Sequence, residues 1–136
     1  MRTGIGRRTA CQLLGVATIA AGLVLRLVRI GLPVFVTKWG GSVLWAAMVY
    51  WLLAGCLPRW RRSAVAGIAV LVAWAVEASR LIHTPWLDHF RVTMAGILLL
   101  GRVFSWWHFA VYAGAIGLAA LADSASLPTL TAKERR

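Results

Sequence analysis

The stretch Ser63-Ala64-Val65-Ala66-Gly67-Ile68-Ala69-Val70-Leu71-Val72-Ala73-Trp74-Ala75-Val76-Glu77 decides the fold class of this chain. It is apolar until it reaches Glu77, which is the only acid among the first 87 residues. A charged side chain at the centre of a membrane helix costs about 2.5–3.5 kcal/mol on insertion scales unless it is paired, solvated or protonated. The stretch therefore predicts a membrane-spanning helix in which Glu77 either pairs with another residue or has a functional role.

The composition of the whole chain is that of a helical membrane protein. Of its 136 residues, 60% are hydrophobic, and four acids stand against fifteen Lys and Arg. A soluble domain averages about 45–50% apolar and about 25% charged residues. The surplus of apolar residues falls into blocks near the roughly 17–25 residues that a spanning helix requires.

We expect an all-α fold, a polytopic membrane helix bundle with four transmembrane helices at about 9–28, 41–58, 63–82 and 103–122. The first block is interpreted as a retained span because no clean signal-peptide cleavage site follows it. The apolar stretch 92–102 reaches only about half of a ~30 Å hydrocarbon core, so it predicts one short half-inserted helix. Residues 9–122 would then form a single membrane domain, between an N-terminal segment at 1–8 and a tail at 123–136.

Basic residues favour one orientation of these spans. With four spans, one side holds Arg2, Arg7, Arg8, Arg59, Arg61, Arg62, Lys133, Arg135 and Arg136. The other side holds Arg26, Arg29, Lys38, Arg80, Arg91 and Arg102, spread over longer connections. The positive-inside rule then places both termini in the cytoplasm. The net charge of +11 indicates contact with the bilayer and its anionic headgroups, and no nucleic acid is expected as a partner.

Polar residues of all four spans fall at one height, near the outer side. At a rise of 1.5 Å per residue, Arg26 and Glu77 lie roughly 25 Å and 21 Å above the cytoplasmic ends of their helices, and His108 lies within about 8 Å of its outer end. Trp45 opens the second span at that level. We expect an outward-facing pocket there, lined by Arg26, Glu77, Arg80, Arg91 and His108, while the inner two-thirds of the bundle look dry.

Two interpretations of Glu77 stay open from the residues alone. In the first, it pairs with one arginine and locks helices together. In the second, it holds a set of arginines whose surplus charge binds an anionic ligand such as a phosphate headgroup. Taken singly, Arg26, Arg29 and Lys38 need no ligand, because their side chains can snorkel to the interface.

Catalytic and metal chemistry have little support in the sequence. His83, Asp88 and His89 lie close together but without a metal-ligand spacing. The spans contain no nucleophile–base set and no carboxylate pair, so we expect no catalytic residues, metal or cofactor, and an enzyme is the least favoured class.

An ordered series of motifs resembles the DUF2809 family of small bacterial membrane proteins. The motifs are Lys38-Trp39-Gly40-Gly41-Ser42-Val43-Leu44-Trp45, Glu77-Ala78-Ser79-Arg80-Leu81, Trp86-Leu87, Arg91-Val92-Thr93, Gly96 and Trp107. The resemblance covers roughly residues 7–122, and the stretch 77–117 has a looser likeness to VanZ-like proteins. Ser42, Arg80 and His108 depart from the family pattern, which has Asp, Gln and Asp there.

The resemblance implies the four-span architecture and the positions of the site, but no activity. We expect the protein to reside in a bacterial inner (cytoplasmic) membrane. With it, the candidate binding residues are Glu77, Arg26, Arg80, Arg91, His108, Trp45, Trp86 and Thr93. The first functional hypothesis is a binding protein for an anionic lipid or envelope precursor. The alternatives are a small proton-linked transporter subunit, with Glu77 or His108 titrating, and a structural assembly partner in a membrane complex. The sequence leaves the oligomeric state open.

Overall fold

The structure is a computed structural model that describes residues 6–28, 31–101 and 103–126. Several residues of the sequence argument lie outside these described ranges: Arg2, Arg29, Arg102 and the basic residues of the tail beyond 126. The helices are α1 (Arg7–Leu27), α2 (Val34–Cys56), α3 (Arg62–Ser79), α4 (Pro85–Arg91), α5 (Met94–Leu99) and α6 (Trp106–Ser126). No strand occurs within the described ranges, so the predicted all-α class is confirmed.

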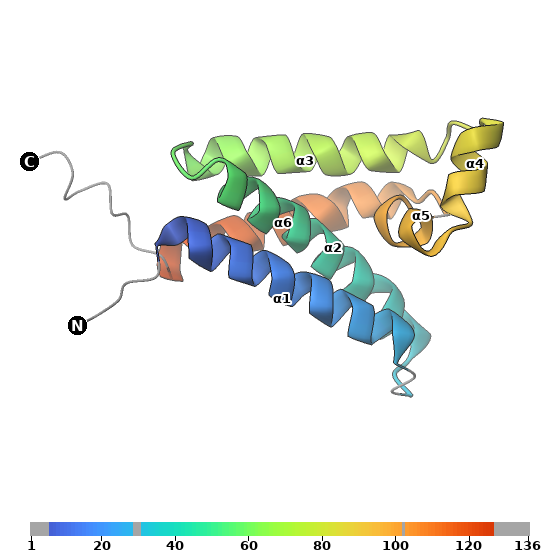
Figure 1. Cartoon of the computed structure of the whole chain (residues 1–136), viewed down its shortest axis with the longest axis horizontal. Coiled ribbons are helices and arrows are strands. Elements are labelled where there is room, and N and C mark those ends of the chain that lie inside the picture. Colours follow the sequence, from blue (N-terminus) through green and yellow to red (C-terminus); the bar gives the residue numbers. More distant parts are fainter. Residues whose placement is uncertain (1–5, 29–30, 102, 127–136) are drawn as a thin grey trace, which may run out of the picture.

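Four of these helices, α1, α2, α3 and α6, are long and apolar enough to cross a membrane. Successive long helices run in opposite directions, and the short helices α4 and α5 lie at one end of the bundle, between α3 and α6 in the chain (Figure 1). Helix α2 packs against α1, α3 and α6, and α3 packs against α6. The protein is therefore a membrane protein built around α2, with α1 on its outside.

The helix ends differ from the expected spans for local reasons. Helix α2 begins earlier than expected, at Val34, because the carbonyl oxygen of Pro33 accepts the amides of Val36 and Thr37 and the fixed φ of proline suits the entry to a helix. Helix α3 ends at Ser79, where the amide of Arg80 bonds to the carbonyl of Glu77 and so tightens the last turn.

The expected short helix at 92–102 is present as α5, and a second short helix, α4, precedes it. Pro85 stands in the first turn of α4, where its missing amide proton is not needed. Thr93 then caps α5, accepting the amide of Gly96. A side chain at Gly96 would overlap the carbonyl of Phe90, so this glycine allows the two short helices to pack closely.

The packed face of α3 recurs every four residues, and that of α6 every three or four. Helix α3 buries Val65, Ala69, Ala73 and Glu77. Helix α6 buries His108, Tyr112, Ile116, Ala119 and Asp123. Small alanine side chains let helix backbones approach closely in a membrane, where dispersion rather than water exclusion holds helices together. The core between these helices is therefore apolar in its middle and polar at both ends.

The outer faces of the long helices carry exposed apolar side chains. Val16, Leu71 and Leu118 are 62%, 66% and 68% exposed. A soluble monomer rarely exposes such surface over its whole circumference. In a bilayer the same side chains face lipid tails, which agrees with the membrane assignment.

A buried ionic cluster closes the end of the bundle where α1 begins and α6 ends, here called the Asp123 end. Asp123 is fully buried and accepts hydrogen bonds from Arg7 Nη2 and Tyr50 Oη, each at 2.7 Å. Arg62 Nε lies 3.3 Å from its other oxygen. These contacts join α1, α2, α3 and α6. The expected dry inner two-thirds of the bundle is thus wrong at this end, because α6 continues past residue 122 and carries Asp123 into the core.

Asp123→Asn should lower the free energy of unfolding by about 3 kcal/mol, because it removes the carboxylate that pairs with the partly buried guanidinium of Arg7. The matched control is Asp88→Asn. It makes the same change in the Arg91–Asp88 pair, where the Asp88 side chain is 46% exposed and Arg91 keeps the carbonyls of Ile82 and Ser79 as acceptors, so it should cost clearly less, about 1 kcal/mol. Unfolding in mixed detergent micelles measures both, and equal losses would contradict a stabilising role specific to Asp123.

Candidate functional site

Glu77 is the centre of a second buried ionic cluster, at the opposite end of the bundle, here called the Glu77 end. Its side chain is fully buried, and Arg80 Nη1 lies 2.5 Å from Oε2. Tyr112 Oη donates to Oε2 at 3.2 Å, and the backbone amide of Ser105 donates to Oε1 at 2.8 Å. The Nδ1 atom of His108 lies 3.0 Å from Oε1. Both carboxylate oxygens therefore have partners, and the charge that the sequence left unexplained is compensated.

The partners of Glu77 reach it because of helix period. Arg80 is three residues further along the chain, at the end of α3, and lies on the same side. His108 and Tyr112 are four residues apart on α6, and their rings stack with centroids 5.4 Å apart. His108 and Tyr112 therefore lie on one face of α6, and this face packs against the face of α3 that carries Glu77.

Arg80 also fixes the segment that connects α5 to α6. Its Nε donates to the carbonyl of Leu100 at 2.5 Å, and its Nη1 donates to the carbonyl of Val103 at 3.0 Å. Gly101 lies between them at φ +69°, and a Cβ there would be only 2.6 Å from the guanidinium. Glycine is needed at this position both for its left-handed conformation and for the close approach of the backbone to Arg80.

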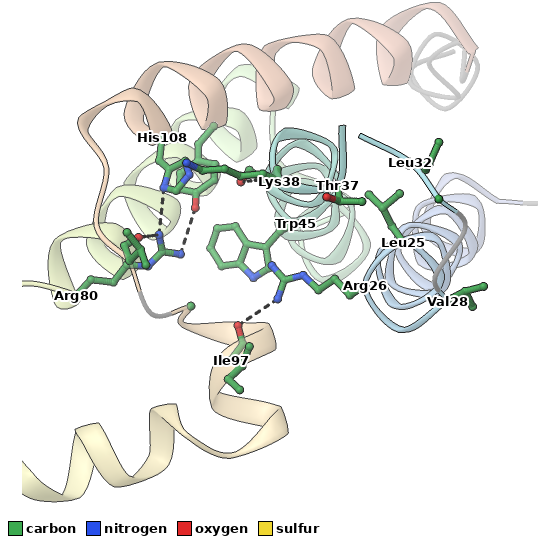
Figure 2. A pocket seen from close by; sticks show the side chains of 15 residues that line it. Leu25, Arg26, Val28, Leu32, Thr37, Lys38, Trp45, Arg80, Ile97 and His108 are labelled. Atoms are coloured by element: carbon green, nitrogen blue, oxygen red, sulfur yellow. Dashed lines mark hydrogen bonds between the residues drawn. The ribbon is translucent and has the colours of Figure 1, made fainter. Parts of the chain in front are cut away.

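A cavity of about 690 Å³ adjoins this cluster. Figure 2 shows it between the end of α1, the start of α2, Arg80 and His108. Its basic lining residues are Arg26, Lys38 and Arg80, and its uncharged polar ones include Thr37, Ser42 and Tyr112. No Asp or Glu is among the described residues that line it. Glu77 does not line the cavity, but it contacts three residues that do: Arg80, His108 and Tyr112.

Arg26 lies on the other wall of the cavity from Arg80 (Figure 2). Its Nη1 donates to the carbonyl of Ile97 in α5 at 3.2 Å. The guanidinium also lies against Gly41, where a Cβ would be 3.6 Å from Nε. One turn further along α2, the indole Nε1 of Trp45 is buried and has no hydrogen-bond partner among the described residues. Two donor groups thus line the cavity without a carboxylate beside them.

The structure brings together most, though not all, of the residues that the sequence proposed. Arg26, Trp45, Arg80 and His108 line the cavity, and Glu77 lies directly behind it. Thr93 caps α5 and does not line the cavity. Trp86 is 74% exposed on α4 and is also outside the lining.

Arg91 is likewise outside the cavity. Its guanidinium donates to the carbonyls of Ile82 and Ser79 and to Asp88. These bonds tie the end of α4 to the end of α3 and to the connection between the two helices, so the side chain is used inside the protein. Glu77 pairs with Arg80, whereas the described partners of Arg91 are Ser79, Ile82 and Asp88, so Arg91 is not part of a set of arginines held by Glu77.

Two buried groups escaped the sequence argument. Tyr112 stands one turn after His108, and Asp123 lies further along the same face of α6. Their helical spacing from His108 is the feature of the sequence that could have predicted their burial. Asp123 was assigned to the tail because the apolar block ends at residue 122. No group of three or more His, Cys, Asp or Glu side chains in the described part of the chain is placed to hold a metal ion.

A family model described as "Protein of unknown function (DUF2809)" matches residues 31–117. The chain belongs to the DUF2809 family. The match includes Glu77, Arg80 and His108, but it does not extend to Arg26 or Asp123. Within the matched range, Arg80 Nη1 lies 3.1 Å from His108 Nδ1. No solved structure matches the chain.

In this DUF2809 protein, Glu77→Gln should cost about 3 kcal/mol of unfolding free energy, because Arg80 would then be a buried charge without a counter-ion. The double variant Glu77→Gln/Arg80→Met should lose clearly less than the sum of the two single losses, since it removes both charges. Some loss remains, because Arg80 also binds the carbonyls of Leu100 and Val103. Unfolding in mixed micelles tests the cycle, and additive single losses would show that the two charges are not coupled.

Proposed function

We propose that this protein binds the anionic headgroup of a lipid or of a lipid-linked envelope precursor, in the cavity between Arg26 and Arg80. The observation that supports the proposal most is that these two arginines have different kinds of partner. Arg80 pairs with Glu77, whereas the described contacts of Arg26 include one carbonyl and no carboxylate. The cavity therefore has a guanidinium whose charge is left for a ligand.

The charge balance of the cavity favours an anion. Arg26 and Lys38 line it without a carboxylate partner among the described residues, and Glu77 accounts for the charge of Arg80 alone. Guanidinium groups bind phosphate and carboxylate through paired hydrogen bonds, which adds geometric specificity to charge. Ser42 and Thr37 add hydroxyl groups to the lining.

The position of Arg26 favours a lipid over a soluble anion. It stands in the last turn of a membrane-length helix, so its guanidinium lies where headgroups meet the hydrocarbon. A long basic side chain reaches that interface with its stem still in the apolar layer. An anionic lipid can therefore bind Arg26 while its headgroup stays in the headgroup region of the bilayer.

Proton-linked transport is the second candidate, and the contact between Glu77 and His108 is the observation that favours it. It requires pH-dependent flux that depends on Glu77. Headgroup binding is preferred because Glu77 is fully buried behind Arg80 and does not line the cavity.

Arg26→Gln should purify folded and retain at least about tenfold less anionic lipid, because a hydrogen-bonded charge contributes about 1.5–3 kcal/mol. Arg8→Gln is the matched control: it removes the same charge from an exposed position near the start of the same helix. Mass spectrometry of the purified proteins measures lipid per protein. Titration of the wild type with inorganic phosphate separates a free anion from a lipid. Equal lipid retention in both variants would end the proposal.

We also propose that the Asp123 end faces the cytoplasm of a bacterium and that the protein resides in its inner membrane. This end holds Arg7, Arg8, Arg59, Arg61 and Arg62 at the ends of spans or in the short connection between α2 and α3. Such short basic segments stay on the cytoplasmic side during insertion.

The orientation can be tested with Cys56, which is exposed at the end of α2, whereas Cys11 is buried. A membrane-impermeant maleimide should label Cys56 in spheroplasts only after permeabilisation. The control is Cys56→Ser/Thr84→Cys, which moves the thiol to an exposed position between α3 and α4 and should be labelled without permeabilisation. Labelling of Cys56 in sealed spheroplasts would reverse the proposed orientation.

A further inference from the structure

A second cavity, of about 320 Å³, opens beside the first between α1, α2 and α5. Its walls include Leu23, Leu44, Met48 and Leu98, and its only charged lining residue in the described part of the chain is Arg26. Arg26 and Trp45 line both cavities. The first cavity, here called the basic cavity, and the second, here called the groove, therefore meet at these two side chains.

The groove exists because the α1 face is unfilled at Gly22. A Cβ at Gly15, two turns earlier on the same face, would lie 3.2 Å from Leu52, which is tight packing against α2. A Cβ at Gly22 would have nothing within 4 Å. Helix α5 forms the facing wall with Ala95, Leu98 and Leu99, and the bond from Arg26 to the carbonyl of Ile97 ties α5 to α1.

The junction of the two cavities has the polarity of an amphiphile. On one side stand the basic side chains, and on the other a groove lined by apolar side chains. At the junction (Figure 2), Trp45 Nε1 is buried and has no hydrogen-bond acceptor among the described residues. A buried donor without a partner costs roughly 1–3 kcal/mol. An oxygen of a ligand that lies across the junction would satisfy it.

We infer that the groove holds a hydrocarbon chain of the same anionic lipid whose headgroup binds at Arg26, an inference that rests on the proposed function. The phosphate lies at Arg26, an ester or phosphate oxygen accepts the indole proton of Trp45, and the chain follows the groove between α1 and α5. The ligand class is thus a lipid with an anionic head and at least one acyl chain. Bulk lipid would cover an apolar groove anywhere on the bundle, whereas this groove continues into a basic cavity at Arg26.

The test fills the groove and leaves the side chains of the headgroup site unchanged. Gly22→Leu places a side chain in the open space of the groove, and Ala95→Leu fills it from the α5 wall. Gly67→Leu is the matched control, because Gly67 is exposed on α3 and a Cβ there also has nothing within 4 Å. All three positions are helical; the two glycine substitutions raise helix propensity, and Ala95→Leu lowers it only slightly.

Three probes with related heads are titrated against each purified protein by native mass spectrometry: glycerol phosphate, dihexanoyl phosphatidylglycerol and dioleoyl phosphatidylglycerol. Loss of burial of two methylene groups already weakens binding about tenfold. Gly22→Leu and Ala95→Leu should therefore weaken the dioleoyl lipid by at least about tenfold and leave glycerol phosphate unchanged. Gly67→Leu should change neither.

The outcomes separate the two proposals. If both groove variants bind the dioleoyl lipid as the wild type does while Arg26→Gln weakens it, the groove inference is wrong and headgroup binding stands. If Arg26→Gln leaves all three probes unaffected, or the wild type binds none of them, both proposals fail. If Gly67→Leu weakens the dioleoyl lipid as much as Gly22→Leu, the effect is not specific to the groove, and the inference is again wrong.

Discussion

The ion pair between Glu77 and Arg80 is the contact on which the Glu77 end of the bundle depends. It places a carboxylate on the packed face of an otherwise apolar helix, which the membrane permits only with a partner. Arg80 supplies that partner and also binds the carbonyls that lead from α5 into α6. One guanidinium therefore compensates a buried charge and fixes a non-helical connection, whose backbone groups need partners within the protein at this depth.

The Asp123 cluster repeats this principle at the other end with different helices. Asp123 joins α6 to Arg7, Tyr50 and Arg62. Between the two acids the core consists mainly of small and apolar side chains, whose contacts are not directional. The ionic clusters thus have the specificity that the apolar middle lacks, because each acid accepts bonds only from donors at set positions. They hold the register of α3 and α6 at one end and of all four long helices at the other.

The division of charge at the Glu77 end shapes the proposed function. Arg80 is neutralised inside the protein, whereas Arg26 on the opposite wall has a carbonyl as its described partner. An arginine used for packing and an arginine open to a ligand therefore face each other across one cavity. The proposed lipid has its head between them and its chain along α1, where Gly22 leaves room.

The sequence by itself determined the four spans, the short helix before the last one, and the common height of Arg26, Glu77, Arg80 and His108. Apolar length and the fixed helical rise set position along the membrane normal, so this information is local. The tertiary structure alone decided which way each side chain faces and which partner it meets. In the folded protein, Arg91 links α4 to the end of α3, Tyr112 donates a hydrogen bond to Glu77, and Asp123 is buried in the core. Those outcomes depend on contacts between helices distant in the chain, and height alone does not specify them.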